Sequence, residues 1–238
     1  RPLSRGLGDV YKRQGVVGGD NICGCMDESA VNYNSQATFD NETCQYYSGQ
    51  MNVLWSKSYE EIGGEMWSLR PVSDGGFIMS LGNATNCVDS ECDYLGQLIR
   101  LDANGDIIWE QKYEGSSALY SAIETSDGGF IAAGYFECNT SMDCYPDMYI
   151  LKTNSDGVVQ WSKTESSANN NNDWARDVIQ TSDGNYVIAG TWNDDGWNSK
   201  ASLRKYDTNG ELIWGNIYTN SVANEAYELI ETDEGDIV

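Results

Sequence analysis

The chain repeats itself about every 53 residues, and this repeat constrains its fold more than any other feature. An apolar run leads into a tryptophan four times, at intervals of 54, 52 and 53 residues, at Trp55, Trp109, Trp161 and Trp214. Within each full interval a Ser-Asp-Gly segment comes first and an Asn-Gly or Asp-Gly segment follows it. Four copies therefore begin, and three of them finish.

Each copy contains four apolar runs bounded by Gly, Asn and Asp, and these predict four strands joined as one antiparallel sheet. One strand precedes the Ser-Asp-Gly turn, one follows it, one precedes the Asn-Gly or Asp-Gly turn, and one contains the tryptophan. Runs such as FIAAG at 130–134 are apolar on both faces, so each sheet needs a neighbour on either side. Stacking of such units predicts an all-β fold, a partial β-propeller of about three and a half four-stranded antiparallel blades.

The rhythm of Trp, Asp-Gly-Gly-Phe-Ile, Tyr-Ile-Leu-Lys, Asn-Gly and Trp over residues 53–238 resembles the propeller repeats of secreted bacterial proteins. Among known propellers, these repeats are broadly similar to those of the PQQ-like and kelch-like families. A complete propeller has roughly four to eight blades, so we expect the native protein to continue past Val238. With each copy starting two residues before its tryptophan, the copies fall at about 53–106, 107–158, 159–211 and, in part, 212–238.

Residues 1–14, RPLSRGLGDVYKRQ, do not match anything that follows and hold four of the 14 basic residues. The string resembles translated sequencing-adapter read-through, so we leave it out of the fold prediction. A native basic tail without structure is the alternative.

Residues 15–50 form a separate small module by prediction. The segment GCMDESAVNYNSQATFDNETC at 24–44 resembles a short motif of secreted bacterial proteins, GCTDPxAxNYNPxAxxDDGSC. A disulfide between Cys25 and Cys44 would stabilise so short a piece, whereas Cys23 has no obvious partner. Four side chains offer oxygen ligands for calcium, although Asn and Asp also cap turns without a metal: Asp27, Asn32, Asn34 and Asp40.

The second and fourth connections of each copy are long, and in an antiparallel sheet they share one end. We expect ligand binding at this end. The connections are residues 83–93, 135–147 and 191–200, together with 57–66, 112–119 and 163–173.

Two of these connections carry cysteine pairs, Cys87 with Cys92 and Cys138 with Cys144. We predict that each pair closes its own loop as a disulfide, because the cysteine usage fits an oxidising compartment. A four-cysteine zinc site bridging two blades is the alternative.

The third long connection, TWNDDGWNSK, places Trp192 and Trp197 beside Asp194 and Asp195. Such a group would suit an aromatic platform for a sugar ring, and Tyr135 at the start of the second connection joins the candidate set. Packing of the tryptophans against their own loop is the alternative.

Composition excludes several classes of function. The net charge of -23 disfavours binding to nucleic acids and anionic membranes, and no run approaches the roughly 18 apolar residues of a membrane-spanning helix. The chain has no histidine, which removes the usual general base and zinc ligand. Seven cysteines indicate a secreted or cell-surface protein.

Together these features predict a non-catalytic extracellular binding or adhesion protein, with a carbohydrate or another surface protein as the ligand. No cofactor is expected apart from the calcium alternative. Two other functions stay open. One is an enzyme on a propeller scaffold, a glycan hydrolase or a quinoprotein, with its site outside these residues. The other is a passive surface spacer.

Overall fold

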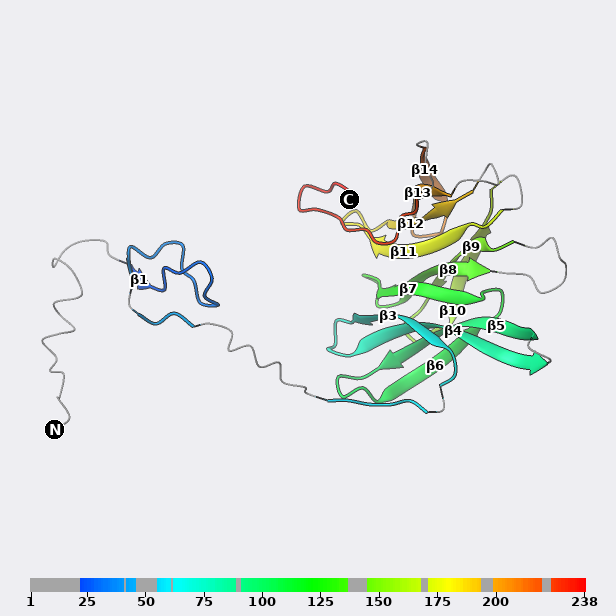
Figure 1. The fold of residues 1–238 in the computed structure, drawn as a ribbon, viewed down its shortest axis with the longest axis horizontal. Helices are drawn as coiled ribbons and strands as arrows, with labels where there is room; N and C mark the ends of the chain where they lie inside the picture. The colour runs from blue at the N-terminus through cyan, green and yellow to red at the C-terminus, as the bar shows by residue number, and fades with distance from the viewer. Residues whose placement is uncertain are drawn as a thin grey trace, which may run out of the picture. The chain divides into compact units, whose positions relative to one another are not determined.

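The computed structural model describes residues 22–40, 42–45, 55–60, 62–88, 91–136, 145–167, 171–193, 199–219 and 224–238. The chain divides into two compact units, Arg1–Ser56 and Lys57–Val238 (Figure 1). Strands are the only regular elements among the described residues, so this part of the chain contains no helix that could cross a membrane. The predicted all-β class is confirmed.

The larger unit contains three four-stranded antiparallel sheets in its described part. In each, the strands pair in chain order, and the sheet runs from the strand before the Ser-Asp-Gly turn to the strand that carries the tryptophan. The strands are β3 (Glu65–Pro71), β4 (Phe77–Val88), β5 (Glu91–Leu101) and β6 (Ile107–Tyr113); β7 (Ala118–Glu124), β8 (Phe130–Phe136), β9 (Asp147–Thr153) and β10 (Val159–Glu165); and β11 (Trp174–Gln180), β12 (Tyr186–Trp192), β13 (Lys200–Tyr206) and β14 (Leu212–Tyr218).

The sheets follow one another as blades, with the first strand of each sheet on the inside (Figure 1). Strand β7 contacts both β3 and β11, so the first strands meet along one line. Side chains alternate across β8: Phe130 and Ala132 pack against the first sheet, whereas Ile131 and Ala133 pack against the third. Burial of both faces confirms the predicted stacking of four-stranded blades into part of a propeller.

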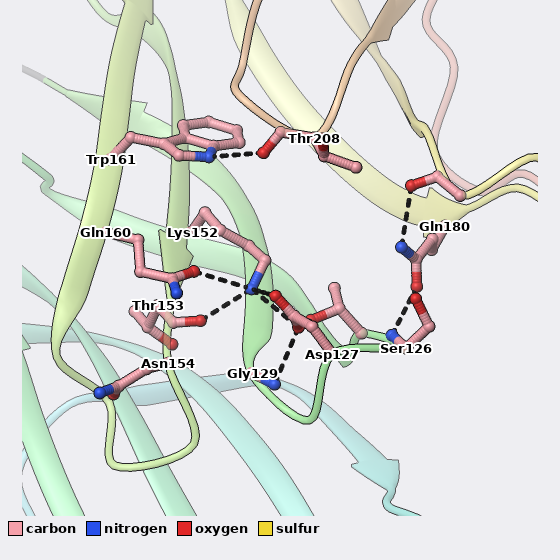
Figure 2. Close-up of polar contacts among 12 residues, drawn as sticks. Ser126, Asp127, Gly129, Lys152, Thr153, Asn154, Gln160, Trp161, Gln180 and Thr208 are labelled. Carbon is pink, nitrogen blue, oxygen red and sulfur yellow. Dashed lines mark hydrogen bonds and ion pairs between the residues drawn. The ribbon is translucent and has the colours of Figure 1, made fainter.

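The repeated tryptophan links each sheet to the next. The indole Nε1 of Trp109 donates to the carbonyl of Ser155 at 3.0 Å, and that of Trp161 donates to the carbonyl of Thr208 at 3.0 Å. Each acceptor lies in the tight turn between the third and fourth strands of the following sheet. Figure 2 shows this contact for Trp161 and Thr208. This contact between blades gives the tryptophan its spacing in the sequence.

Residues 57–59 make the same kind of contact on the first sheet. The Tyr59 hydroxyl donates to the carbonyl of Gly105 at 2.7 Å, as the Tyr113 hydroxyl of β6 does to Gly157 at 2.9 Å. Tyr59 also packs on the apolar cluster of the first sheet's outer face. This segment therefore docks on the first sheet as β6 docks on the second.

The smaller unit contains the parallel pair β1 (Cys23–Gly24) and β2 (Phe39–Asp40). The disulfide between Cys25 and Cys44 is present. It confirms the pairing that the motif implied.

Candidate functional site

The first strand of each sheet carries a bulge at the same position. The pairing register slips around Trp67 in β3, around Tyr120 in β7 and around Arg176 in β11. A bulge leaves one residue without a cross-strand partner and changes the direction of its side chain. All three side chains line one cavity where the first strands meet.

In the second and third sheets a glycine on the second strand makes room for the bulge, whereas the first sheet has Leu81 at that place. Gly134 lies opposite Leu119, and a Cβ on Gly134 would lie 1.9 Å from the carbonyl oxygen of Ala118. A Cβ on Gly190 would lie 2.0 Å from the carbonyl oxygen of Trp174. The final glycine of the FIAAG and YVIAG runs is therefore required by the close approach of two backbones.

The cavity has a volume of about 370 Å³. Because each bulge falls at the third residue of its strand, the cavity lies towards the strand ends that receive the connections 114–117 and 166–173. Its lining joins all three sheets and the fourth copy, and consists of Trp67, Ser68, Arg70, Tyr120, Ser121, Arg176, Asp177, Tyr227 and Glu228.

Aromatic rings make up one part of the lining. The Trp67 and Tyr120 rings meet edge to face, with centroids 4.8 Å apart, and Tyr135 stacks on Tyr120 at 5.5 Å. Tyr120 is half-buried by these contacts, whereas Trp67 remains 48% exposed and Tyr227 61% exposed. Trp67 and Tyr227 therefore carry most of the accessible aromatic surface.

Arg176 lies among the rings. Its guanidinium carbon is 4.8 Å from the centroid of Tyr120, 4.9 Å from that of Trp174 and 5.4 Å from that of Tyr227. A guanidinium nitrogen is also 3.7 Å from a carboxylate oxygen of Glu225. These cation–π contacts and the nearby carboxylate hold the positive charge in place.

Asp177 ties the strands around the cavity together. Its buried carboxylate accepts hydrogen bonds from the Ser121 hydroxyl at 2.6 Å and from the Leu229 backbone N–H at 3.0 Å. A guanidinium nitrogen of Arg70 lies 3.8 Å away. Glu228, by contrast, is exposed and makes no polar contact within the described part of the chain.

A second buried carboxylate fixes the connections at this end. Asp173 accepts hydrogen bonds from the backbone N–H groups of Ser167 at 2.6 Å and Asn193 at 2.7 Å. Burial raises the pKa of Asp173 even though these bonds oppose the change. The pKa of Asp147 is also raised, by burial and by the charge of Asp173.

The predicted ligand residues separate in the structure. Tyr135 does not line the cavity but stacks on Tyr120, which does. Trp192 is half-buried in the cluster between the second and third sheets, with the Arg204 guanidinium 4.4 Å from its ring centroid. Trp192 does not line the cavity. Asp194, Asp195 and Trp197 lie outside the described residues, so the sugar platform stays a prediction.

The first long connection is shorter than predicted. Residues 83–93 were expected to form a loop, but β4 and β5 continue through much of this range and pair as far as Val88 with Glu91. Cross-strand hydrogen bonding extends the hairpin beyond the apolar core that the sequence marks. The side chains of Cys87 and Cys92 lie outside the described residues, as do Cys138 and Cys144, so the disulfide and zinc alternatives stay open.

The four candidate calcium ligands all bond to nearby groups of the small module. Asp27 accepts from the backbone and hydroxyl of Ser29, and Asn34 and Asp40 each accept from the N–H two residues ahead. Asn32 donates to the Thr43 carbonyl and accepts from the Gln45 N–H. Within the described residues no cluster of three or more His, Cys, Asp or Glu could hold a metal ion. Calcium stays a prediction.

The cavity residues were not singled out from the sequence. Trp67, Tyr120, Arg176 and Tyr227 each stand seven residues before the acidic residue of their turn segment. Aligning the four copies on that turn would have shown one position that varies between aromatic residues and arginine. This variation inside a regular repeat is the signal that could have located the cavity.

No family model matches the chain, and no curated protein matches it. Among solved structures, a protein of unknown function from Bacteroides caccae aligns with a TM-score of 0.50 and 16% identity, covering 77% of this chain and 55% of that one. A protein of unknown function from Dyadobacter fermentans aligns with a TM-score of 0.49 and 14% identity, covering 73% of this chain and 60% of that one. The chain thus spans less than two thirds of either protein's length. The first similarity supports a shared all-β fold and says nothing of activity.

Proposed function

We propose that this chain is part of a non-catalytic extracellular binding protein whose ligand enters the cavity between the first strands. The cavity carries this proposal, because three successive bulges bring chemically different side chains to one point while the surrounding sheets keep the same plan. A pocket with accessible aromatic surface and a few convergent polar groups is typical of ligand sites.

Export is part of the proposal. The disulfide between Cys25 and Cys44 favours an oxidising compartment. The repeat and the small module resemble those of secreted bacterial propeller proteins, and a secreted or surface protein with net charge -23 would suit an uncharged or cationic ligand better than a polyanion.

Screening the 238-residue chain on arrays of glycans and of surface proteins tests the proposal, with Trp67→Ala as the site variant. Tyr218→Ala is the matched control, since Tyr218 is 48% exposed like Trp67 and lies outside the cavity. We expect Trp67→Ala to weaken binding by about tenfold or more and Tyr218→Ala to leave it unchanged. A ligand affinity that Trp67→Ala leaves unchanged, or the absence of any bound ligand, would contradict a site in this cavity.

A glycan hydrolase is the second candidate, because two carboxylates, Asp177 and Glu228, line the same cavity. The contacts of Asp177 with Ser121 and Leu229 favour a structural role for it. Release of reducing sugar from any bound glycan, abolished by Glu228→Gln, would establish the hydrolase instead.

A further inference from the structure

The accessible rings of the cavity favour a ligand with a flat, partly apolar face. Trp67 and Tyr227 are the exposed aromatic residues of the lining. They hold the same repeat position in the first and fourth copies. An aromatic face packs well against the C–H groups of a sugar ring, and polar groups beside it can bond the hydroxyls.

A cationic ligand does not suit the cavity, because the cation position is already filled. Arg176 lies within 5.4 Å of the centroids of three rings, Tyr120, Trp174 and Tyr227. Any ammonium group would have to displace this guanidinium from its aromatic neighbours and from Glu225.

An anionic ligand does not suit it either. The guanidinium of Arg70 lies 3.8 Å from Asp177, and that of Arg176 lies 3.7 Å from Glu225. Glu228 adds a further carboxylate to the lining and forms no ion pair within the described part of the chain. An entering carboxylate or sulfate would compete for neutralised arginines and meet an acidic protein.

Hydrogen-bonding groups remain available for a neutral polar ligand. The Ser68 hydroxyl is buried and has no hydrogen-bond partner among the described residues, and the Glu228 carboxylate is exposed. A buried polar group without a partner is unfavourable, so a ligand hydroxyl that reaches Ser68 would gain a bond that the free protein lacks.

We infer that the cavity binds a neutral sugar ring, stacked on Trp67 and Tyr227 and hydrogen-bonded by Ser68 and Glu228. This inference rests on the proposed function and narrows its ligand to uncharged glycans. It also assigns Arg176 a positioning role, since its guanidinium fills the aromatic cage and holds Tyr227 beside the cavity.

Calorimetric titration of the full 238-residue chain with three kinds of probe tests the inference. The neutral probes are cellohexaose, maltohexaose, xylohexaose and mannohexaose, the acidic probe is trigalacturonic acid, and the cationic probe is tetramethylammonium. We expect at least one neutral probe to bind, with an affinity that changes less than about twofold between 50 and 500 mM NaCl because no net charge is neutralised. Trp67→Ala and Tyr227→Ala should each weaken it about tenfold, and Tyr218→Ala should not.

Two further variants distinguish the possible failures. Glu228→Gln, at an exposed position that should not disturb folding, should weaken the neutral probe, and Arg176→Ala should allow tetramethylammonium to bind. Trp67-dependent binding of trigalacturonic acid alone would overturn the neutral ligand and leave the proposed function intact. The sugar inference also fails if none of the neutral probes binds, whereas the proposed function fails only if the arrays too find no ligand that depends on Trp67.

Discussion

The two ends of each first strand differ in how much they vary from sheet to sheet. At the turn end, the Asp of every Ser-Asp-Gly turn pairs with a cation on the third strand: Asp74 with Arg100 at 2.6 Å, Asp127 with Lys152 at 2.9 Å, and Asp183 with Lys205 at 2.7 Å. At the bulge end, the bulged residue is different in each sheet: Trp67, Tyr120 and Arg176. Tyr227 holds the same repeat position in the fourth copy. The contacts that recur hold the blades together, and the position that varies is the one to which we assign ligand binding in the proposed function.

The turn end also joins neighbouring sheets. The backbone N–H of Ser126 donates to the side-chain oxygen of Gln180 in the next sheet at 2.7 Å, and Gln180 donates in turn to the Gly184 carbonyl at 2.9 Å (Figure 2). Ser73 bonds to Glu124 in the same way. Each turn is therefore fixed from within its own sheet and from the following one.

Gly134→Ala should give the largest loss of stability, because Gly134 of β8 lies directly against the backbone of β7 beside the bulge. The new Cβ would lie 1.9 Å from the Ala118 carbonyl oxygen and 2.8 Å from the Leu119 Cα. These atoms belong to the backbone of β7, which cannot move aside easily, so we expect the free energy of unfolding, measured in urea, to fall by about 3 kcal/mol or more.

Gly128→Ala at the turn end is the control for that substitution. Gly128 has φ of +79°, and a Cβ added to it would meet nothing within 4 Å, so only left-handed backbone strain of about 1 kcal/mol should result. Equal losses in the two variants would mean that the close approach at the bulge does not limit the fold.

Lys152→Ala should have the next largest effect. The buried side chain, 2% exposed, donates to Asp127, to the Thr153 carbonyl and to Gln160. Its removal leaves the buried carbonyl without this donor, whereas water can reach the Asp127 carboxylate, whose side chain is 54% exposed. We therefore expect the free energy of unfolding to fall by about 2 kcal/mol, less than for a fully buried ion pair.

Lys152→Arg and Lys112→Ala are the controls for this contact. Arg100 occupies the equivalent place in the first sheet, opposite Trp109 as Lys152 is opposite Trp161, so an arginine should retain most of the stability. Lys112 is exposed on β6, and its loss should cost less than about 0.5 kcal/mol. A large loss in Lys152→Arg would show that the repeated cation is not interchangeable between blades.

The sequence predicts the blades better than the cavity, and the reason is physical. Tryptophans and turns recur with the sheets because local alternation and tight turns are enough to specify a four-stranded antiparallel unit. A bulge depends on the register between two strands, so Trp67 and Tyr120 look like ordinary strand aromatics in the sequence. The assignment of 83–93 to a loop was wrong for a related reason, since pairing between β4 and β5 continues past the apolar residues.

The turn end should respond to acid, and this is the smallest effect expected. Partial burial opposes ionisation of Asp127, but hydrogen bonds from Thr125, Lys152 and the Gly129 N–H outweigh it and lower its pKa from 3.8 to about 2. A lowered pKa in the folded state means that Asp127 stabilises the protein above pH 3.8 and that this contribution disappears as the pH falls towards 2. In Asp127→Asn, unfolding free energy measured from pH 5 to pH 2 should start lower and fall less steeply than in the wild type.

Asp173→Asn at the opposite end should change the same pH profile in the opposite direction. Burial raises the pKa of Asp173, so in the wild type the folded state holds its proton more tightly than the unfolded state does. Its ionisation therefore reduces stability as the pH rises through the interval above 3.8, and the asparagine variant should lack this decrease. If both variants shifted the acid limb in the same direction, the contrast between a charge-paired turn and a desolvated connection would not account for the pH response. Opposite shifts would show that the charge-paired carboxylate at the repeated turn stabilises the fold when it is ionised, whereas the desolvated carboxylate at the other end of the blade does so when it is protonated.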